Sequence, residues 1–326
     1  MSRTRQTVLY AVLALGLGEL VGWLWIASPG KGWLTQFLMW TPGVAALLLT
    51  TLVRKEPPRA LGFSFTGTGP WLAAYLYPFG VFTGCIALAY ACDAVLRTQL
   101  IVFHPEVMKA TFFGAEHQGL SLLGWRFLSS LLVMLPWLVL ALAYRFQVPE
   151  RFGRARPLAA FLLWAQVFWF NPGRWWIPPG TIGEELGWRG FVVRLWKDRP
   201  LTSLALTSAM WAAFHLPVVI HEEPLHAFVP ALAFLASIAA AAAVFQALYL
   251  WSGSVWPPIV AHFSWNFWNP FILGNQYGPS KSVFGGVIWV INGEGLFGLV
   301  FNGLLTVFLV LMWRKRQASA TPLRME

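Results

Sequence analysis

Six polar side chains stand out because they lie in segments that are otherwise apolar. An ionisable side chain in the hydrocarbon of a bilayer costs roughly 2.5–3.5 kcal/mol on insertion scales, so such residues are functional candidates by default. Together they offer a carboxylate, two imidazoles, an amide and a supporting ion pair, which is enough to activate water and stabilise an oxyanion. The six candidates, on three successive apolar segments, are Glu184, Glu185, Arg189, His215, His262 and Asn266.

Helix geometry separates the two adjacent glutamates. Glu185 and Arg189 are four residues apart and share a helix face, which is the spacing of an ion pair. Glu184 lies about 100° around the helix and cannot share that geometry equally, so we expect it to be the freer carboxylate. Pro178 and Pro179 predict a helix start just upstream, which places Glu184 in the early turns, where unsatisfied N–H groups favour an anion.

The two later segments present their polar groups in a similar way. His262 and Asn266 are four residues apart, so they present an imidazole and an amide to one point in the bundle. His215 stands two residues before Pro217, which biases Leu216 away from helical geometry. The sequence therefore predicts a local unwinding of the helix beside His215.

Buried polar residues also serve as hydrogen-bonded glue between helices. We interpret Glu19 and Asn302, each isolated in its segment, in this structural way. For Glu185 with Arg189, a positioning pair and a direct part in chemistry both stay open. The complete set of six exceeds what helix association requires.

Other catalytic motifs fit the sequence poorly. In the run from His221 to His226 the histidines are five residues apart and Pro224 prevents the helix that a zinc-binding H-E-x-x-H needs, so we interpret this run as a solvated loop. The chain's aspartates, Asp93 and Asp198, lie at loop edges, which excludes a pair of aspartates within spans. Neither a Gly-x-Ser-x-Gly elbow nor a phosphate-binding Gly-Lys-Ser/Thr loop is present.

The elements that must position these residues are membrane helices. Of the 326 residues, 57% are hydrophobic and 11% are charged, a composition that excludes an ordinary soluble domain. The prediction is an all-α polytopic transmembrane bundle of about 8–10 membrane segments. Segments 158–171 and 182–196 are short and are separated by a stretch rich in helix breakers. The predicted apolar segments are 7–28, 33–53, 70–92, 122–144, 158–171, 182–196, 200–220, 227–251, 255–274 and 286–313.

Charge and cysteine placement refine this prediction. The net charge is +10, but the basic residues lie between apolar runs rather than among exposed aromatics, so we expect no nucleic-acid partner. Their bias toward alternate loops predicts both termini in the cytoplasm and an even number of spans. Residues 93–121 form one long outer loop. Cys85 and Cys92 are too far apart along one helix to form a disulfide.

The three polar motifs, in this order on separate apolar segments, resemble those of a known family. Glu184-Glu185-x-x-x-Arg189, an aromatic residue four positions before His215, and His262-x-x-x-Asn266 resemble the CPBP family of CAAX proteases and bacteriocin-processing membrane proteins. That family includes the Ras-converting type II CAAX endopeptidases. The resemblance covers roughly residues 158–274. One departure is Trp211 where the family's second motif usually has Phe, which we interpret as a conservative change in bulk.

The resemblance implies an intramembrane endopeptidase with its site between helices. Glu184 and His215 would polarise a water, and His262 with Asn266 would hold the oxyanion, while Glu185 and Arg189 would brace the site. The same resemblance leaves a metal open, since members are labelled both metalloproteases and glutamate proteases. A catalytic zinc would be held by Glu184, His215 and His262. We favour metal-independent water activation, with no certain cofactor.

The resemblance also suggests how the chain is divided and what it acts on. We expect N-terminal transmembrane segments over 1–157, a catalytic core over 158–274, and a C-terminal segment with a short basic tail over 275–326. The substrate would be a peptide or membrane-protein segment, either prenylated or a leader peptide. The alternative is a non-catalytic membrane regulator or bacteriocin-immunity protein of the same fold. We expect a multi-pass protein of a bacterial plasma membrane; a transporter would carry charged residues in both halves.

Overall fold

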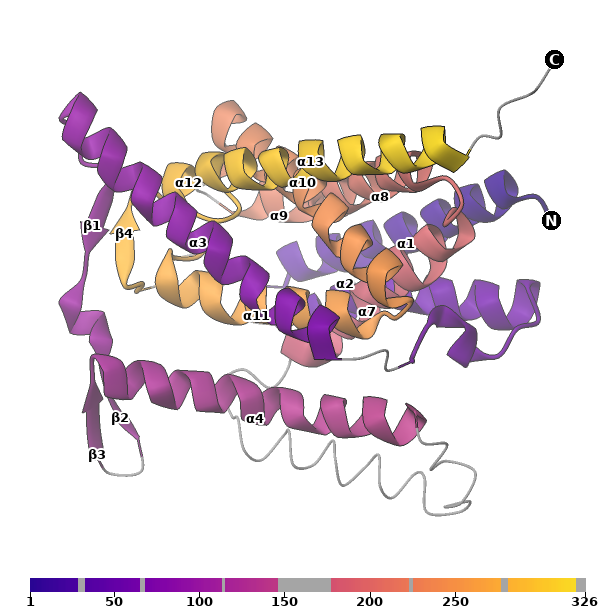
Figure 1. The fold of residues 1–326 in the computed structure, drawn as a ribbon, viewed down its shortest axis with the longest axis horizontal. Coiled ribbons are helices and arrows are strands. Elements are labelled where there is room, and N and C mark those ends of the chain that lie inside the picture. Colours follow the sequence, from indigo (N-terminus) through magenta and orange to yellow (C-terminus); the bar gives the residue numbers. More distant parts are fainter. Residues whose placement is uncertain are drawn as a thin grey trace.

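Helices dominate the computed structural model, in agreement with the predicted all-α class (Figure 1). The structure describes residues 1–28, 33–64, 68–112, 115–145, 177–222, 225–276 and 281–320. Two of the longer helical segments contain π-helix, η1 and η5. The helical elements are α1 (Arg3–Ile26), α2 (Leu34–Leu48), η1 (Leu49–Val53), η2 (Pro58–Leu61), α3 (Thr68–Leu96), η3 (Pro105–Met108), α4 (Leu120–Arg145), α7 (Ile177–Glu185), η5 (Leu186–Val193), α8 (Pro200–Phe214), α9 (Leu216–His221), α10 (Phe228–Ser252), α11 (Trp256–Ile272), α12 (Ile288–Ile291) and α13 (Leu296–Ala320).

Six helical spans within the described ranges are long and apolar enough to cross a bilayer. They cover Arg3–Ile26, Leu34–Val53, Thr68–Leu96, Pro200–His221, Phe228–Ser252 and Ile288–Arg314. A shorter apolar helix covers Leu120–Leu132. The segment formed by α7 and η5 carries three charged residues close together, and α11 has only 17 residues, so both are less typical of a simple span.

Where they fall within the described residues, the predicted apolar segments correspond to these helices, with one correction. Segment 286–313 was expected to be one helix, but the chain breaks after α12 and restarts as α13. Asn292 adopts an extended conformation there, and its side chain accepts a hydrogen bond from the backbone N–H of Glu294. Segment 200–220 is divided at His215, where unwinding was predicted. Segment 158–171 and most of the breaker-rich stretch after it lie outside the described residues.

The long loop predicted over residues 93–121 contains short strands, which the sequence did not reveal. β1 (Ile101–Phe103) pairs antiparallel with β4 (Phe284–Gly286), and β2 (Lys109–Phe112) pairs with β3 (Ala115–Gln118). Both two-stranded sheets lie at the end of the bundle opposite the N-terminus (Figure 1). The first turn of α1 and the last turns of α13 lie together at the other end, which agrees with an even number of crossings.

Close backbone packing holds the candidate site's helix against α2. Gly183 of α7 lies against Gly43 of α2; a Cβ atom at Gly183 would lie 2.6 Å from the carbonyl oxygen of Met39. One at Gly43 would lie 2.7 Å from the carbonyl oxygen of Gly183. Small residues of this kind allow membrane helices to approach closely. Cys85 and Cys92 are free, as predicted.

Candidate active site

The first polar motif lies where an α-helix becomes a π-helix. α7 begins at Ile177, so Pro178 and Pro179 occupy its first turn, where a missing N–H costs nothing. The helix start predicted just upstream of Glu184 is therefore present. Past Glu185 the chain continues as η5, and π-helical turns of this kind are frequent at functional sites.

Glu185 is the centre of a buried charged cluster. Its Oε1 accepts a hydrogen bond from Arg189 Nη1 at 3.1 Å, and both side chains are fully buried, so the predicted ion pair is present. The same oxygen lies 3.0 Å from Nδ1 of His262, which comes from α11. An ionised carboxylate only accepts hydrogen bonds, so Nδ1 of His262 must carry a proton and donate a hydrogen bond to Glu185. This bond fixes the orientation of the imidazole, and it leaves Nε2 on the opposite edge of the ring.

Glu184 faces that opposite edge. Its Oε1 lies 4.0 Å from Nε2 of His262, and its Oε2 accepts a hydrogen bond from the indole N–H of Trp211 at 2.8 Å. Glu184 as a whole residue is 2% exposed. The two adjacent glutamates thus have different partners, as the helix spacing predicted. Glu185 is paired with a cation, whereas Glu184 is held by a neutral donor and lies beside an imidazole.

His215 occupies the break between α8 and α9. Its backbone, at φ −89° and ψ 2°, ends one helix and begins the next, and Pro217 lies in the first turn of α9. The angles fall in the bridge region, where many active-site residues are found. Nδ1 of His215 donates to the carbonyl oxygen of Trp211 at 2.7 Å. Its Nε2 is therefore the nitrogen that can accept a proton when the ring is neutral.

Trp211 connects these groups, and its importance was missed in the sequence. Besides its bond to Glu184, its ring lies edge-on to His262 at a centroid distance of 5.7 Å. The guanidinium of Arg189 lies 4.4 Å from the centroid of the same ring. Phenylalanine could supply the aromatic surface but has no N–H to donate. The signal in the sequence is an indole N–H donor one helical turn before His215, and a comparison of bulk alone does not reveal it.

Asn266 and His262 do not share the same contacts. His262 is 6% exposed and bonded to Glu185, while Asn266, one turn further along α11, is only half-buried. Within the described residues no hydrogen bond joins the Asn266 amide to the cluster. Direct contacts thus unite Glu184, Glu185, Arg189 and His262, and His215 reaches them through Trp211.

The arrangement does not fit the zinc ligand set that the resemblance left open. Across the described part of the chain, no group of three or more His, Cys, Asp or Glu side chains is placed to hold a metal ion. The proposed ligands Glu184, His215 and His262 thus do not form such a group, and a metalloprotease assignment is not supported. At the other histidine-rich run, His226 Nε2 donates to the carbonyl oxygen of Ile220, and the ring of His221 contacts Trp25.

A third buried carboxylate, Glu294, was also missed in the sequence. It lies at the break between α12 and α13 and is 4% exposed, and its Oε1 accepts from the indole N–H of Trp265 at 2.9 Å. Asn292 and Asn269 are hydrogen-bonded to each other beside it. Because the sequence predicts one continuous helix over 286–313, it does not single out Glu294. Asn302, interpreted as interhelical glue, is buried and accepts from the Tyr77 hydroxyl at 2.6 Å, the kind of bond that role requires.

Comparison with known proteins bears on the same region. Residues 155–268 match a family model described as type II CAAX prenyl endopeptidase Rce1-like. Over these residues the chain is similar to the Rce1-like family of CAAX proteases. All six candidate residues lie within the match. No curated protein matches the chain.

The family match and the apolar helices together describe an integral, multi-pass membrane protein. The similarity over residues 155–268 suggests a membrane protease, and such a protease implies a peptide substrate and a membrane setting. The matched range overlaps the catalytic core predicted over 158–274. The division of the chain into three parts stays a prediction.

Proposed function

We propose that this chain is an intramembrane endopeptidase that hydrolyses a peptide bond with a water activated by Glu184 and His215. The proposal depends most on one observation, the buried Glu184 carboxylate held 4.0 Å from Nε2 of His262 and oriented by the N–H of Trp211. The Rce1-like match supports peptide-bond hydrolysis, because it names a family of endopeptidases.

In the proposed reaction Glu184 takes a proton from water while the oxygen adds to the scissile carbonyl carbon. The Nε2 of His215, whose other nitrogen is engaged with a backbone carbonyl, accepts a hydrogen bond from the same water. The C–N bond then breaks, and the proton passes from Glu184 to the departing amine. General acid–base catalysis of this kind contributes typically 10²–10⁴-fold.

The oxyanion that forms in this step needs donors. With Nδ1–H bonded to Glu185, a cationic His262 would present Nε2–H to the oxyanion. Asn266 would add its amide N–H, and for this its half-buried side chain must turn toward the substrate. Glu185 and Arg189 are then positioning residues: Glu185 holds the imidazole of His262, and Arg189 offsets the charge of Glu185.

The substrate class is a peptide or membrane-protein segment that reaches the site from the bilayer. A prenylated terminus and a leader peptide are the two forms to compare, and a bacterial plasma membrane is the setting we infer. The second candidate function is a partner-binding protein of the same fold. The contacts that unite both glutamates, Arg189 and His262, with His215 connected through Trp211, favour the enzyme, because a scaffold does not require buried charges.

Cleavage of fluorogenic peptides by the detergent-purified chain tests the proposal. We expect wild-type cleavage, with Glu184→Gln reducing kcat/KM by about 10³-fold, because the amide cannot take the proton of water. Glu106→Gln is the matched control, since Glu106 lies on the exposed loop helix η3. A parallel arm with a zinc chelator should retain activity. Full activity in Glu184→Gln would overturn its role as base, and loss of activity with chelator would overturn metal-independent water activation.

A further inference from the structure

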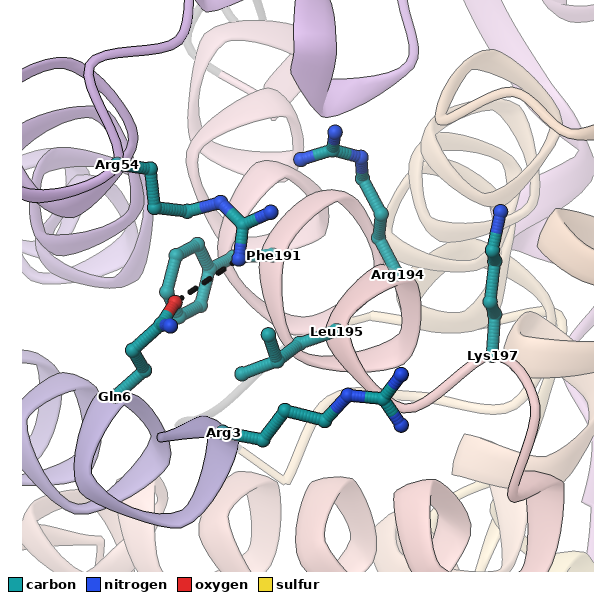
Figure 2. Close-up of a pocket in the computed structure, with 7 residues that line it drawn as sticks. All are labelled: Arg3, Gln6, Arg54, Phe191, Arg194, Leu195 and Lys197. Carbon is teal, nitrogen blue, oxygen red and sulfur yellow. Dashed lines mark hydrogen bonds between the residues drawn. The ribbon is translucent and has the colours of Figure 1, made fainter. Parts of the chain in front are cut away.

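Four cationic side chains surround a cavity of about 260 Å³ at one end of the helix bundle. Arg3 comes from the first turn of α1, Arg54 follows η1, and Arg194 and Lys197 follow η5. Figure 2 shows them around the side chains of Phe191 and Leu195. The cavity is separate from the polar cluster of the candidate active site, since none of the cluster's residues lines it.

The carboxylates near this cavity do not balance its positive charge. Asp198 accepts from Nη1 of Arg3 at 2.7 and 2.8 Å, and Glu56 pairs with Arg54 at 2.8 Å and with Arg194 at 2.9 Å. The hydrogen bond from Arg54 is the main cause that lowers the pKa of Glu56, and Arg194 lowers it further, so Glu56 is charged at neutral pH. Four cations against two carboxylates leave two positive charges in excess.

Some of the donors here are not used within the described part of the protein. The ammonium of Lys197 is exposed and forms no ion pair or hydrogen bond there. Arg54 donates from Nη1 to Gln6 at 2.9 Å, but its buried Nε has no hydrogen-bond partner. A phosphate accepts several N–H bonds at once and is bound strongly by guanidinium groups. The excess charge and the spare donors therefore favour an anion with several acceptor oxygens.

The position of the cavity indicates where such an anion comes from. α1 begins at Arg3, η1 ends at Val53 and η5 ends at Val193, so the cations lie at the ends of membrane helices. Phe191 and Leu195 are 2% and 9% exposed and give the cavity an apolar wall. Basic pockets between membrane helices at the polar surface suit lipid headgroups, because the phosphate meets the cations while the rest of the lipid stays in the bilayer.

We propose that this cavity binds the phosphate of an anionic phospholipid headgroup. The phosphate lies between Arg54, Arg194 and Lys197, and Arg3 closes the side formed by α1. Occupancy connects three segments that are distant in the sequence, so bound lipid stabilises the fold. This inference does not depend on the peptidase reaction.

Thermal unfolding of the full-length chain in detergent, with added lipid, tests this site. Phosphatidylglycerol should raise Tm by several degrees and phosphatidylcholine should not, and native mass spectrometry should show retained phosphatidylglycerol. Lys197→Gln should weaken the binding of phosphatidylglycerol about fivefold, since a basic residue near an anionic lipid contributes about 1 kcal/mol. Lys55→Gln, a nearby exposed lysine that does not line the cavity, is the matched control and should bind as wild type.

Three results would overturn the proposal. Equal stabilisation by the two lipids would remove the anionic preference. Equal weakening by Lys197→Gln and Lys55→Gln would show attraction by the whole surface rather than by this cavity. A Tm shift with inorganic phosphate as large as that with phosphatidylglycerol would assign the cavity to a soluble anion and not to a lipid.

The variant Arg54→Gln tests the buried donor in the same assays and should also weaken the binding of phosphatidylglycerol.

Discussion

In two regions of this protein a buried glutamate accepts a hydrogen bond from a tryptophan N–H, yet the surroundings of the two glutamates differ. Glu184 accepts from Trp211 and Glu294 accepts from Trp265, at nearly equal distances of 2.8 and 2.9 Å. Beside Glu184 lies the imidazole of His262, which also bonds the second carboxylate, Glu185, so the set includes groups that can exchange protons. The guanidinium of Arg189 pairs with Glu185. Beside Glu294 lie the amides of Asn292 and Asn269 at a helix break.

Burial of a carboxylate does not by itself indicate catalysis. Amides orient and connect helices but do not titrate, so the Glu294 region is suited to holding α11 against the turn before α13. A base needs a partner that can share or receive a proton. We therefore expect chemistry at Glu184 and a structural role at Glu294, and the following variants test that division.

Arg189→Met should have the largest effect among them. The variant leaves Glu185 buried without its cation. Removing one partner of a buried ion pair lowers the free energy of unfolding by about 3–5 kcal/mol. We expect a clear fall in Tm and loss of peptide cleavage. The double variant Arg189→Met with Glu185→Leu should recover much of the stability, while activity stays lost because His262 has no acceptor for Nδ1–H. Unchanged Tm in Arg189→Met would contradict the bracing role.

Gly183→Ala should come next, with a loss of about 1–3 kcal/mol, as overpacking of a close contact typically costs. The new Cβ would lie 2.6 Å from the backbone oxygen of Met39, and the backbone has little freedom to withdraw. Gly16→Ala is the control, since nothing lies within 4 Å of a Cβ there. Chemical denaturation or thermal unfolding in detergent measures both. Equal stability of the two variants would contradict the close packing of α7 on α2.

Trp211→Phe should reduce kcat/KM about tenfold and should lower Tm about as much as Trp265→Phe does. A hydrogen bond to a charged group contributes about 1.5–3 kcal/mol, and here it orients the carboxylate that acts as base. Trp265→Phe is the matched control because it removes the same kind of bond from Glu294. If it reduced cleavage as strongly as Trp211→Phe, the two regions would not differ in function.

Glu294→Gln should have the smallest effect on cleavage. Glutamine keeps the acceptor for Trp265 and the size of the side chain, so we expect kcat/KM within about threefold of wild type and a stability change of about 1 kcal/mol. Steady-state cleavage and thermal unfolding of the same preparation measure both. A large loss of kcat/KM with a normal Tm would make Glu294 part of the reaction.

Much of the candidate site could be predicted because it depends on local helix spacing. The Glu185–Arg189 pair, the separation of Glu184 and the unwinding beside His215 each follow from a few neighbouring residues. Contacts between helices do not follow in this way. The bond from His262 to Glu185 joins residues 77 apart, and the bond from Trp211 to Glu184 joins residues 27 apart.

The incorrect predictions have the same origin. Hydrophobicity alone made 286–313 look like one helix, because Gly293 and Gly295 do not lower the mean hydropathy enough to reveal a break. The pairing of β1 with β4 connects segments almost two hundred residues apart, so no local sequence pattern predicts it. The cationic cavity needs the ends of three helices brought together, which the positive-inside pattern only suggests.

The most direct measurement compares peptide cleavage by Glu184→Gln and Glu294→Gln, purified in the same detergent and confirmed to be folded. Both variants replace one buried glutamate with its amide and keep a tryptophan bond. We expect a loss of about 10³-fold in kcat/KM for Glu184→Gln and of less than about threefold for Glu294→Gln. Equal losses, or the greater loss in Glu294→Gln, would contradict the assignment of Glu184 as the base.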